Sequence, residues 1–132
     1  MSVEPLKTPS ATAAGPYSPA VRAGDWIVVS GQIGIDPATG ELAAATPDQV
    51  RQALDNMTAV LADCGCDWSG VAKTTVFAAV SASEMPAINA VYEEVVGSSL
   101  PARSTIGVAW LPKGAVFEIE AWVYKPQNRP EA

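Results

Sequence analysis

The residues best suited to chemistry are one arginine and two glutamates near the end of the sequence. Arg103 opens a predicted strand, while Glu118 and Glu120 interrupt a later one. Pro101 is expected to keep Leu100 extended, so that the guanidinium is delivered at the first turn of the strand. A guanidinium is a planar fork of donors that fits a carboxylate, and a carboxyl group in apolar surroundings can exchange protons. Two interpretations stay open: Arg103 and a glutamate form a structural ion pair at a solvated edge, or they form a site for an anionic ligand.

Two shorter segments could line such a site. The segment SGQIG, residues 30–34, ends a hydrophobic run with small residues, which leaves the Gly31 N–H as a possible donor to a ligand. The segment GPYSPA, residues 15–20, holds Tyr17 rigidly between two prolines. Each segment also has a simpler explanation that involves no ligand. Gly31 would then be a β-bulge or sheet-packing glycine, and Tyr17 an aromatic side chain that fills a gap. Neither segment has the spacing of a phosphate-binding or dinucleotide-binding loop.

The residue types that are missing exclude several kinds of enzyme. The chain has no histidine, and its two cysteines are Cys64 and Cys66. Without histidine it cannot build a Ser-His or Cys-His pair, and two thiols alone cannot complete a four-ligand zinc site. We therefore expect no metal, and a pair of reduced thiols near a helix end in the cytosol.

Charge and hydropathy limit the kinds of partner that the protein is expected to have. The net charge is −6, from 8 basic and 14 acidic residues, and no basic run stands out. Nucleic-acid affinity depends on neutralising phosphates, so we expect no nucleic-acid partner, and an acidic membrane surface is disfavoured for the same reason. No segment approaches the length of a membrane span, so the sequence predicts a soluble, cytoplasmic protein.

Size and composition predict a single domain over residues 1–132. A chain of 132 residues can bury roughly two thirds of the surface that its unfolded form exposes. Hydrophobic residues make up 48% and charged residues 17% of the chain, which leaves apolar surface to spare and favours an oligomer.

Apolar periodicity predicts the elements that must position these residues. The first helix has Thr46 as its N-cap, Gln49 completing a capping box and Gly65 as its stop. The order of elements predicts an α+β fold, a mixed β-sheet with two helices packed on one face. The expected elements are strands over 25–35 and 71–80, helices over 46–65 and 83–97, and a C-terminal hairpin over 103–125. The second helix points its apolar residues inward, namely Ile88, Tyr92 and Val95.

The last strand has two different faces, because alternate residues of a strand point to opposite sides of the sheet. One face is apolar and is expected to meet the helices, with Ala115, Phe117, Ile119, Ala121 and Val123. The other face mixes carboxylates with aromatic rings, as expected where a sheet meets solvent, a ligand or another subunit. It carries Val116, Glu118, Glu120, Trp122 and Tyr124.

Six segments in this order resemble the Rid (YjgF-like, formerly L-PSP) enamine/imine deaminases: GPYSPA, SGQIG, QALDNM, KTTVF, NAVYEEV and PARSTIGVAWLPKGAVFEIEAWV. The resemblance runs from about Gly15 to Lys125. It implies the chorismate mutase-like Rid fold and a homotrimer whose sheets line a central barrel, with clefts between neighbouring subunits. It also implies a hydrolase of C–N bonds, a 2-iminobutanoate/2-iminopropanoate deaminase. Such an enzyme converts reactive 2-imino acids and enamines such as 2-aminoacrylate to 2-keto acids and ammonia, without a metal, nucleotide or pyridoxal phosphate.

The same resemblance assigns roles to residues. Arg103 would bind the substrate carboxylate, and Glu118 would position the attacking water and carry its proton to the leaving ammonia. Two other functions stay open on this fold: a keto-acid-binding regulatory module without turnover and, disfavoured by the net charge, an endoribonuclease or translation inhibitor. Further substrate-binding residues implied by the resemblance are Tyr17, Ser30, Gly31, Asn89 and Thr105, where several family members have cysteine and a backbone N–H remains available.

Overall fold

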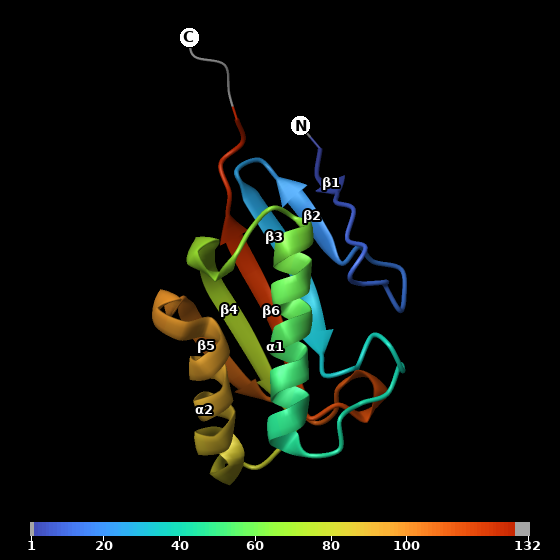
Figure 1. Cartoon of the computed structure of the whole chain (residues 1–132), viewed down its shortest axis with the longest axis vertical. Helices are drawn as coiled ribbons and strands as arrows, with labels where there is room; N and C mark the ends of the chain where they lie inside the picture. Colours follow the sequence, from blue (N-terminus) through green and yellow to red (C-terminus); the bar gives the residue numbers. More distant parts are fainter. Residues whose placement is uncertain (1, 129–132) are drawn as a thin grey trace.

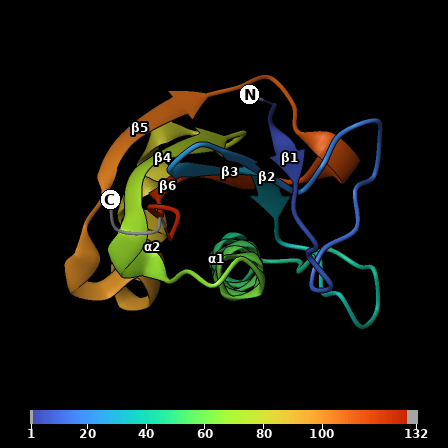
Figure 2. The same cartoon turned by 90° about the horizontal axis from the view of Figure 1, so that it is seen from above.

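The computed structural model describes residues 2–128 and shows one mixed sheet covered on one face by two helices (Figures 1 and 2). The strands lie in the order β1-β2-β3-β6-β4-β5, and among the strand pairs of the described residues only β4–β5 is parallel. The predicted α+β sheet with helices on one face is confirmed. The ends of the expected domain, residue 1 and residues 129–132, lie outside the described residues. The strands are β1 Glu4–Pro5, β2 Ala20–Ala23, β3 Trp26–Ile33, β4 Val71–Ala78, β5 Ala102–Gly107 and β6 Phe117–Tyr124.

The predicted C-terminal hairpin is wrong, because β4 lies between β5 and β6. The chain leaves β4, forms a helix and returns as β5 beside β4 in the same direction, which is the crossover that a parallel pair requires. A connection containing the short 3₁₀ turn Pro112–Gly114 then carries the chain to β6, which pairs with both β3 and β4. Arg103 and the glutamates therefore lie on strands that are not neighbours.

The entry into β5 also differs from the prediction. Leu100 is left-handed, with φ 38° and ψ 66°, although the following Pro101 favours an extended residue. It follows the single turn Gly97–Ser99, and this turn and Leu100 together reverse the chain from the second helix into the sheet. Arg103 is nevertheless the second residue of β5, as expected for a residue at the first turn of a strand.

Helix α1, Thr46–Asp63, lies along β3 and β6 (Figure 1). Its N-cap is Ala45 rather than Thr46, and no side chain caps it, so the capping-box prediction is wrong. The Gln49 side chain instead accepts a hydrogen bond of 3.0 Å from the backbone N–H of Val116, which ties the helix to the segment before β6. Gly65 follows the helix with φ 72°, which confirms the predicted stop.

Helix α2, Met85–Val96, covers the other part of the same sheet face, beside α1 (Figure 2). Ile88 and Tyr92 are buried as predicted, whereas Val95 is only half-buried and Val96 takes the buried position. None of the helices in residues 2–128 is long and apolar enough to cross a membrane.

The two faces of β6 are as predicted. Phe117, Ile119, Ala121 and Val123 are fully buried under the helices. The opposite face, called the open face below, carries no helix within the described residues and exposes large aromatic side chains. Trp122 is 45% and Tyr124 51% exposed there. The polar groups Glu118 and Glu120 share this open face.

Candidate active site

The predicted site residues form two separate groups in one chain. Tyr17, Gly31 and Glu118 line a single pocket, with Ser30 directly beside Gly31. Arg103 and Thr105 lie on the edge strand β5, beyond β4, and Asn89 lies on α2. We call these the Glu118 group and the Arg103 group.

The two groups also project from opposite faces of the sheet. In the register of β4 with its neighbours, Arg103 lies opposite the buried Thr74, on the helix-covered face, and Glu118 lies opposite Phe77, on the open face. The structural ion pair between Arg103 and a glutamate is therefore wrong for a single chain. The ion pair found in residues 2–128 joins Arg51 and Glu94 on the exposed surface of the helices.

Glu118 is placed in surroundings that favour its protonated form. Its side chain is half-buried, and no ion pair or side-chain hydrogen bond to it is found within residues 2–128. Burial, and secondarily the negative charge of Glu120, raises the pKa of Glu118 above the ordinary glutamate value. A carboxyl group whose pKa moves towards neutrality is a better general acid and base, which supports proton transfer at this position.

Gly31 makes room for the Glu118 side chain. The register of β3 against β6 shifts between Val29 and Gln32, so Gly31 lies in an irregularity of the kind a bulge produces. A Cβ added to Gly31 would lie 2.6 Å from Cδ and 2.7 Å from Oε2 of Glu118. The bulge and the proposed ligand contact are thus compatible interpretations of the same glycine.

We expect Gly31→Ala to lower turnover about tenfold or more while changing the melting temperature little. The added methyl group meets a movable carboxyl rather than backbone, so the Glu118 side chain must move away from it and loses its productive position. Steady-state kinetics and thermal denaturation measure the two quantities. Gly70→Ala is a matched control, because its Cβ would meet no atom closer than 3.4 Å. Unchanged turnover in Gly31→Ala would count against a role for the Glu118 position.

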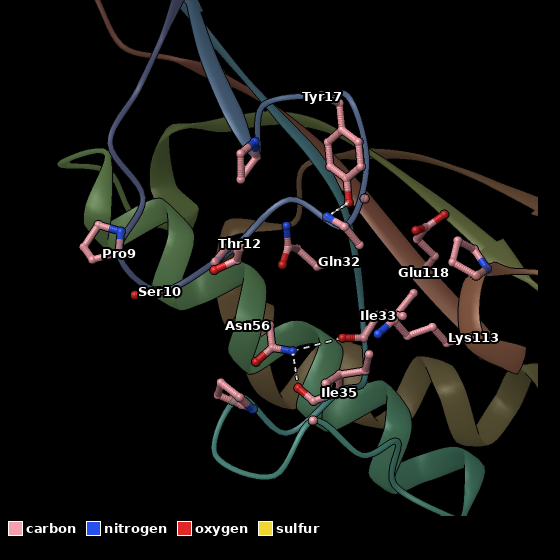
Figure 3. Close-up of a pocket in the computed structure, with 17 residues that line it drawn as sticks. Pro9, Ser10, Thr12, Tyr17, Gln32, Ile33, Ile35, Asn56, Lys113 and Glu118 are labelled. Carbon is pink, nitrogen blue, oxygen red and sulfur yellow. Dashed lines mark hydrogen bonds between the residues drawn. The ribbon is translucent and has the colours of Figure 1, made fainter.

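The pocket has a volume of about 400 Å³ and opens between β3, the segment over residues 9–19 and the turn before β6 (Figure 3). Sequence reasoning missed three of its polar lining residues, Gln32, Asn56 and Lys113. The Asn56 side chain donates hydrogen bonds of 2.9 and 2.8 Å to the carbonyl groups of Ile33 and Ile35, which fixes the end of β3 at the pocket base. A usable signal for Lys113 was its place in an LPKG turn, five residues before the first glutamate of EIE.

Ser30 and Tyr17 stabilise the pocket wall in this chain. The Ser30 hydroxyl donates a hydrogen bond of 2.7 Å to the carbonyl of Ser18, and its backbone N–H donates one of 2.8 Å to Pro19. Tyr17 is 52% exposed, and its hydroxyl accepts a hydrogen bond of 3.3 Å from the Ala14 N–H. Ser30 therefore holds the loop over residues 15–20 against β3, whereas the Tyr17 bond is local to the segment before it, with the Tyr17 ring beside the pocket (Figure 3).

The Arg103 group is exposed along the free edge of the sheet. All six residues of β5 are exposed, and within the described residues no strand pairs with its outer edge. Arg103 lies with its Cζ 4.8 Å from the centre of the Tyr92 ring. Asn89 is exposed on α2 three residues before Tyr92, hence on neighbouring positions of one helix face. A fixed cation on an exposed strand edge is suited to bind a small carboxylate where another surface covers it.

Apolar side chains surround this edge. Leu100 is 66%, Ile106 45% and Trp110 76% exposed. An unpaired strand edge with large exposed apolar side chains is typical of a surface that meets another protein surface.

The comparisons with known proteins agree with this fold. The family described as Endoribonuclease L-PSP matches residues 8–125. A 2-iminobutanoate/2-iminopropanoate deaminase of Homo sapiens is 42% identical over 120 residues, covering 90% of this chain and 85% of that protein. A RutC family protein of Pyrococcus horikoshii is 43% identical over 112 residues, covering 84% of this chain and 88% of that protein.

Solved structures give the same result. The YjgF gene product of E. coli superposes with a TM-score of 0.84 at 37% identity, covering 92% of this chain and 97% of that one. E. coli TdcF with bound serine superposes with a TM-score of 0.86 at 35% identity, covering 92% of this chain and 98% of that one. Sequence, fold and relatives together show that the chain belongs to the Rid (YjgF/L-PSP) family.

Proposed function

We propose that the protein hydrolyses 2-imino acids, and their enamine tautomers such as 2-aminoacrylate, to 2-keto acids and ammonia in a site between two copies of the chain. The observation that carries the proposal is the separation of two complementary groups. A guanidinium suited to a carboxylate and a carboxyl with a raised pKa lie on opposite faces of one sheet, on strands that are not neighbours. Each is half of a site that a second copy can complete.

The roles of the residues follow from their chemistry. Arg103 of one copy holds the substrate carboxylate through two parallel hydrogen bonds, with the backbone N–H of Thr105 beside it. Glu118 of a neighbouring copy accepts a proton from water as the water oxygen bonds to the imine carbon. The protonated Glu118 then gives that proton to the nitrogen, which forms a tetrahedral carbinolamine. Glu118 next accepts the proton of the carbinolamine hydroxyl and passes it to the amine, so that the C=O bond forms as the C–N bond breaks, and a keto acid and ammonia leave. Tyr17 and the Gly31 N–H would orient the substrate over the open face.

The test is a panel of amino acids fed to an amino-acid oxidase, with the decay of the imine followed with and without the protein. We expect imine decay and ammonia release to accelerate in proportion to protein concentration, and to return to the spontaneous rate with Arg103→Ala. Keto-acid binding without accelerated decay would instead support the regulatory module. Ribonuclease activity that survives Arg103→Ala, with contaminants excluded, would support a nuclease.

We expect the protein to be a homotrimer, with a mass in solution of three times 13.7 kDa. The unpaired β5 edge and the exposed aromatic side chains of the open face both need partners, and three copies arranged around these surfaces would bury them. Light scattering at micromolar concentration measures the mass. A stable monomer would contradict the trimer and, with it, the site between copies.

A further inference from the structure

The guanidinium of Arg103 is held over an aromatic ring that belongs to the hydrophobic core. Its Cζ lies 4.8 Å from the centre of the Tyr92 ring, within the range of a cation–π contact. Tyr92 is a residue of α2 and only 6% exposed, so packing in the core fixes the ring that contacts the guanidinium. Arg103 itself is exposed, and no ion pair or side-chain hydrogen bond to it is found within residues 2–128.

The ring is also held at its hydroxyl. The Tyr92 hydroxyl and the Thr74 hydroxyl form a buried hydrogen bond of 2.8 Å. Thr74 is fully buried on β4 and lies directly opposite Arg103 in the β4–β5 register. Arg103 and Thr74 are thus connected in two ways. Their strands pair with each other, and the Tyr92 side chain contacts both residues.

We propose that Tyr92, whose ring is fixed by packing and is joined to Thr74 at its hydroxyl, is a positioning residue that orients Arg103 for the substrate carboxylate. The inference rests on the proposed function. A free arginine side chain would populate many rotamers and would lose that freedom on binding, whereas a guanidinium already held over a ring has less freedom to lose. No side-chain hydrogen bond occupies the N–H groups of Arg103 within residues 2–128, so they are available for a carboxylate.

Binding of pyruvate to the full-length protein tests the proposal. We expect Tyr92→Leu, which keeps apolar volume but has no ring, to weaken pyruvate binding about threefold or more and to raise KM for the imine more than it lowers kcat. Tyr92→Phe keeps the ring face and should bind pyruvate within about twofold of the wild type, although it loses the bond to Thr74. In the Arg103→Ala background, Tyr92→Leu should have no further effect on binding.

Ile88→Ala serves as the matched control for packing. Ile88 is fully buried on the same helix, so its truncation destabilises α2 without removing the ring. We expect it to lower the melting temperature while leaving pyruvate binding within about twofold. The proposal fails if Ile88→Ala weakens binding as much as Tyr92→Leu, if Tyr92→Phe is as weak as Tyr92→Leu, or if Tyr92→Leu binds normally.

A spectroscopic arm separates this inference from the proposed function. Protons over an aromatic face are shielded, so the Arg103 side-chain NMR signals should be shifted upfield in the wild type and in Tyr92→Phe, and should move to ordinary positions in Tyr92→Leu. If the wild type shows this shift and binds pyruvate but does not accelerate imine decay, the positioning role stands and the deaminase function fails. Unshifted Arg103 signals in the wild type would overturn the positioning role whatever the turnover, even if Tyr92→Leu did not fold.

Discussion

Arg103→Lys is expected to lower kcat/KM for the imine nearly as much as Arg103→Ala, by about thirtyfold or more. Lysine keeps the positive charge but loses the planar fork that makes two parallel hydrogen bonds, and an ammonium does not stack on the Tyr92 ring as a guanidinium does. Truncating one partner of a desolvated, hydrogen-bonded charge pair costs about 2 to 5 kcal/mol, which corresponds to that loss. Steady-state kinetics on both variants give the comparison.

Arg51→Lys is the matched control for the arginine substitution. Arg51 lies on the exposed surface of α1, paired with Glu94, and an exposed ion pair contributes little to stability. This variant should keep both normal turnover and a normal melting temperature. If Arg103→Lys also kept near-normal turnover, the carboxylate would have to be bound elsewhere. If it lowered only the melting temperature, Arg103 would have a structural role.

The faces of the sheet could be predicted because they depend on a local rule. Side chains alternate along any strand, so the sequence around Phe117 was sufficient to separate the buried face from the face that carries Glu118. The helix stop at Gly65 could be predicted for a similar reason, since glycine adopts a positive φ without a steric cost.

Strand pairing and helix capping could not be predicted, because long-range contacts decided them. The hairpin prediction assumed that consecutive strands pair, but the crossover through α2 places β5 beside β4 and leaves β6 to fill the centre of the sheet. Gln49 was expected to cap its own helix. The Gln49 side chain instead accepts a hydrogen bond from the backbone N–H of Val116, which lies far along the chain and would otherwise lack an acceptor.

The site was predictable only in part, for a related reason. Tyr17, Gly31 and Glu118 line one pocket. Arg103 does not join them in one chain, because the sheet separates the two groups. No pattern within a single sequence states which surfaces of two copies will meet, and the expectation of a site between copies came only from the family resemblance.

Glu118→Gln is expected to lower kcat by about a hundredfold or more while pyruvate binding persists. The amide has nearly the same shape as the carboxyl group, but it cannot accept the proton of the attacking water, and positioned general acid–base groups contribute about a hundredfold to ten-thousandfold. Kinetics and pyruvate titration therefore separate it from Arg103→Lys, which should lose both binding and turnover. Glu120→Gln is the control on the same face, opposite Thr75, and should keep most of its turnover.

The same substitution should stabilise the protein at neutral pH. Because burial raises the pKa of Glu118, the folded state binds its proton more tightly than the unfolded state. The stability that this tighter proton binding contributes is complete below the ordinary glutamate pKa and is lost as the pH rises through the raised pKa. At neutral pH the folded state therefore holds a charged, partly buried carboxylate, which is less favourable than a neutral group at the same place. Glu118→Gln removes that cost, so its melting temperature should exceed that of the wild type at neutral pH, and the difference should shrink as the pH falls below the ordinary glutamate pKa.

Glu120→Gln provides the internal check on this argument. The negative charge of Glu120 is the second cause of the raised pKa, so its removal should move the pH dependence of Glu118 to lower pH without abolishing turnover. Melting curves and kcat measured across the acidic range follow both effects. A variant Glu118→Gln that is catalytically dead and also less stable at neutral pH would mean that the charged carboxylate is held by a favourable contact. The protonation step assigned to Glu118 would then have to be reconsidered.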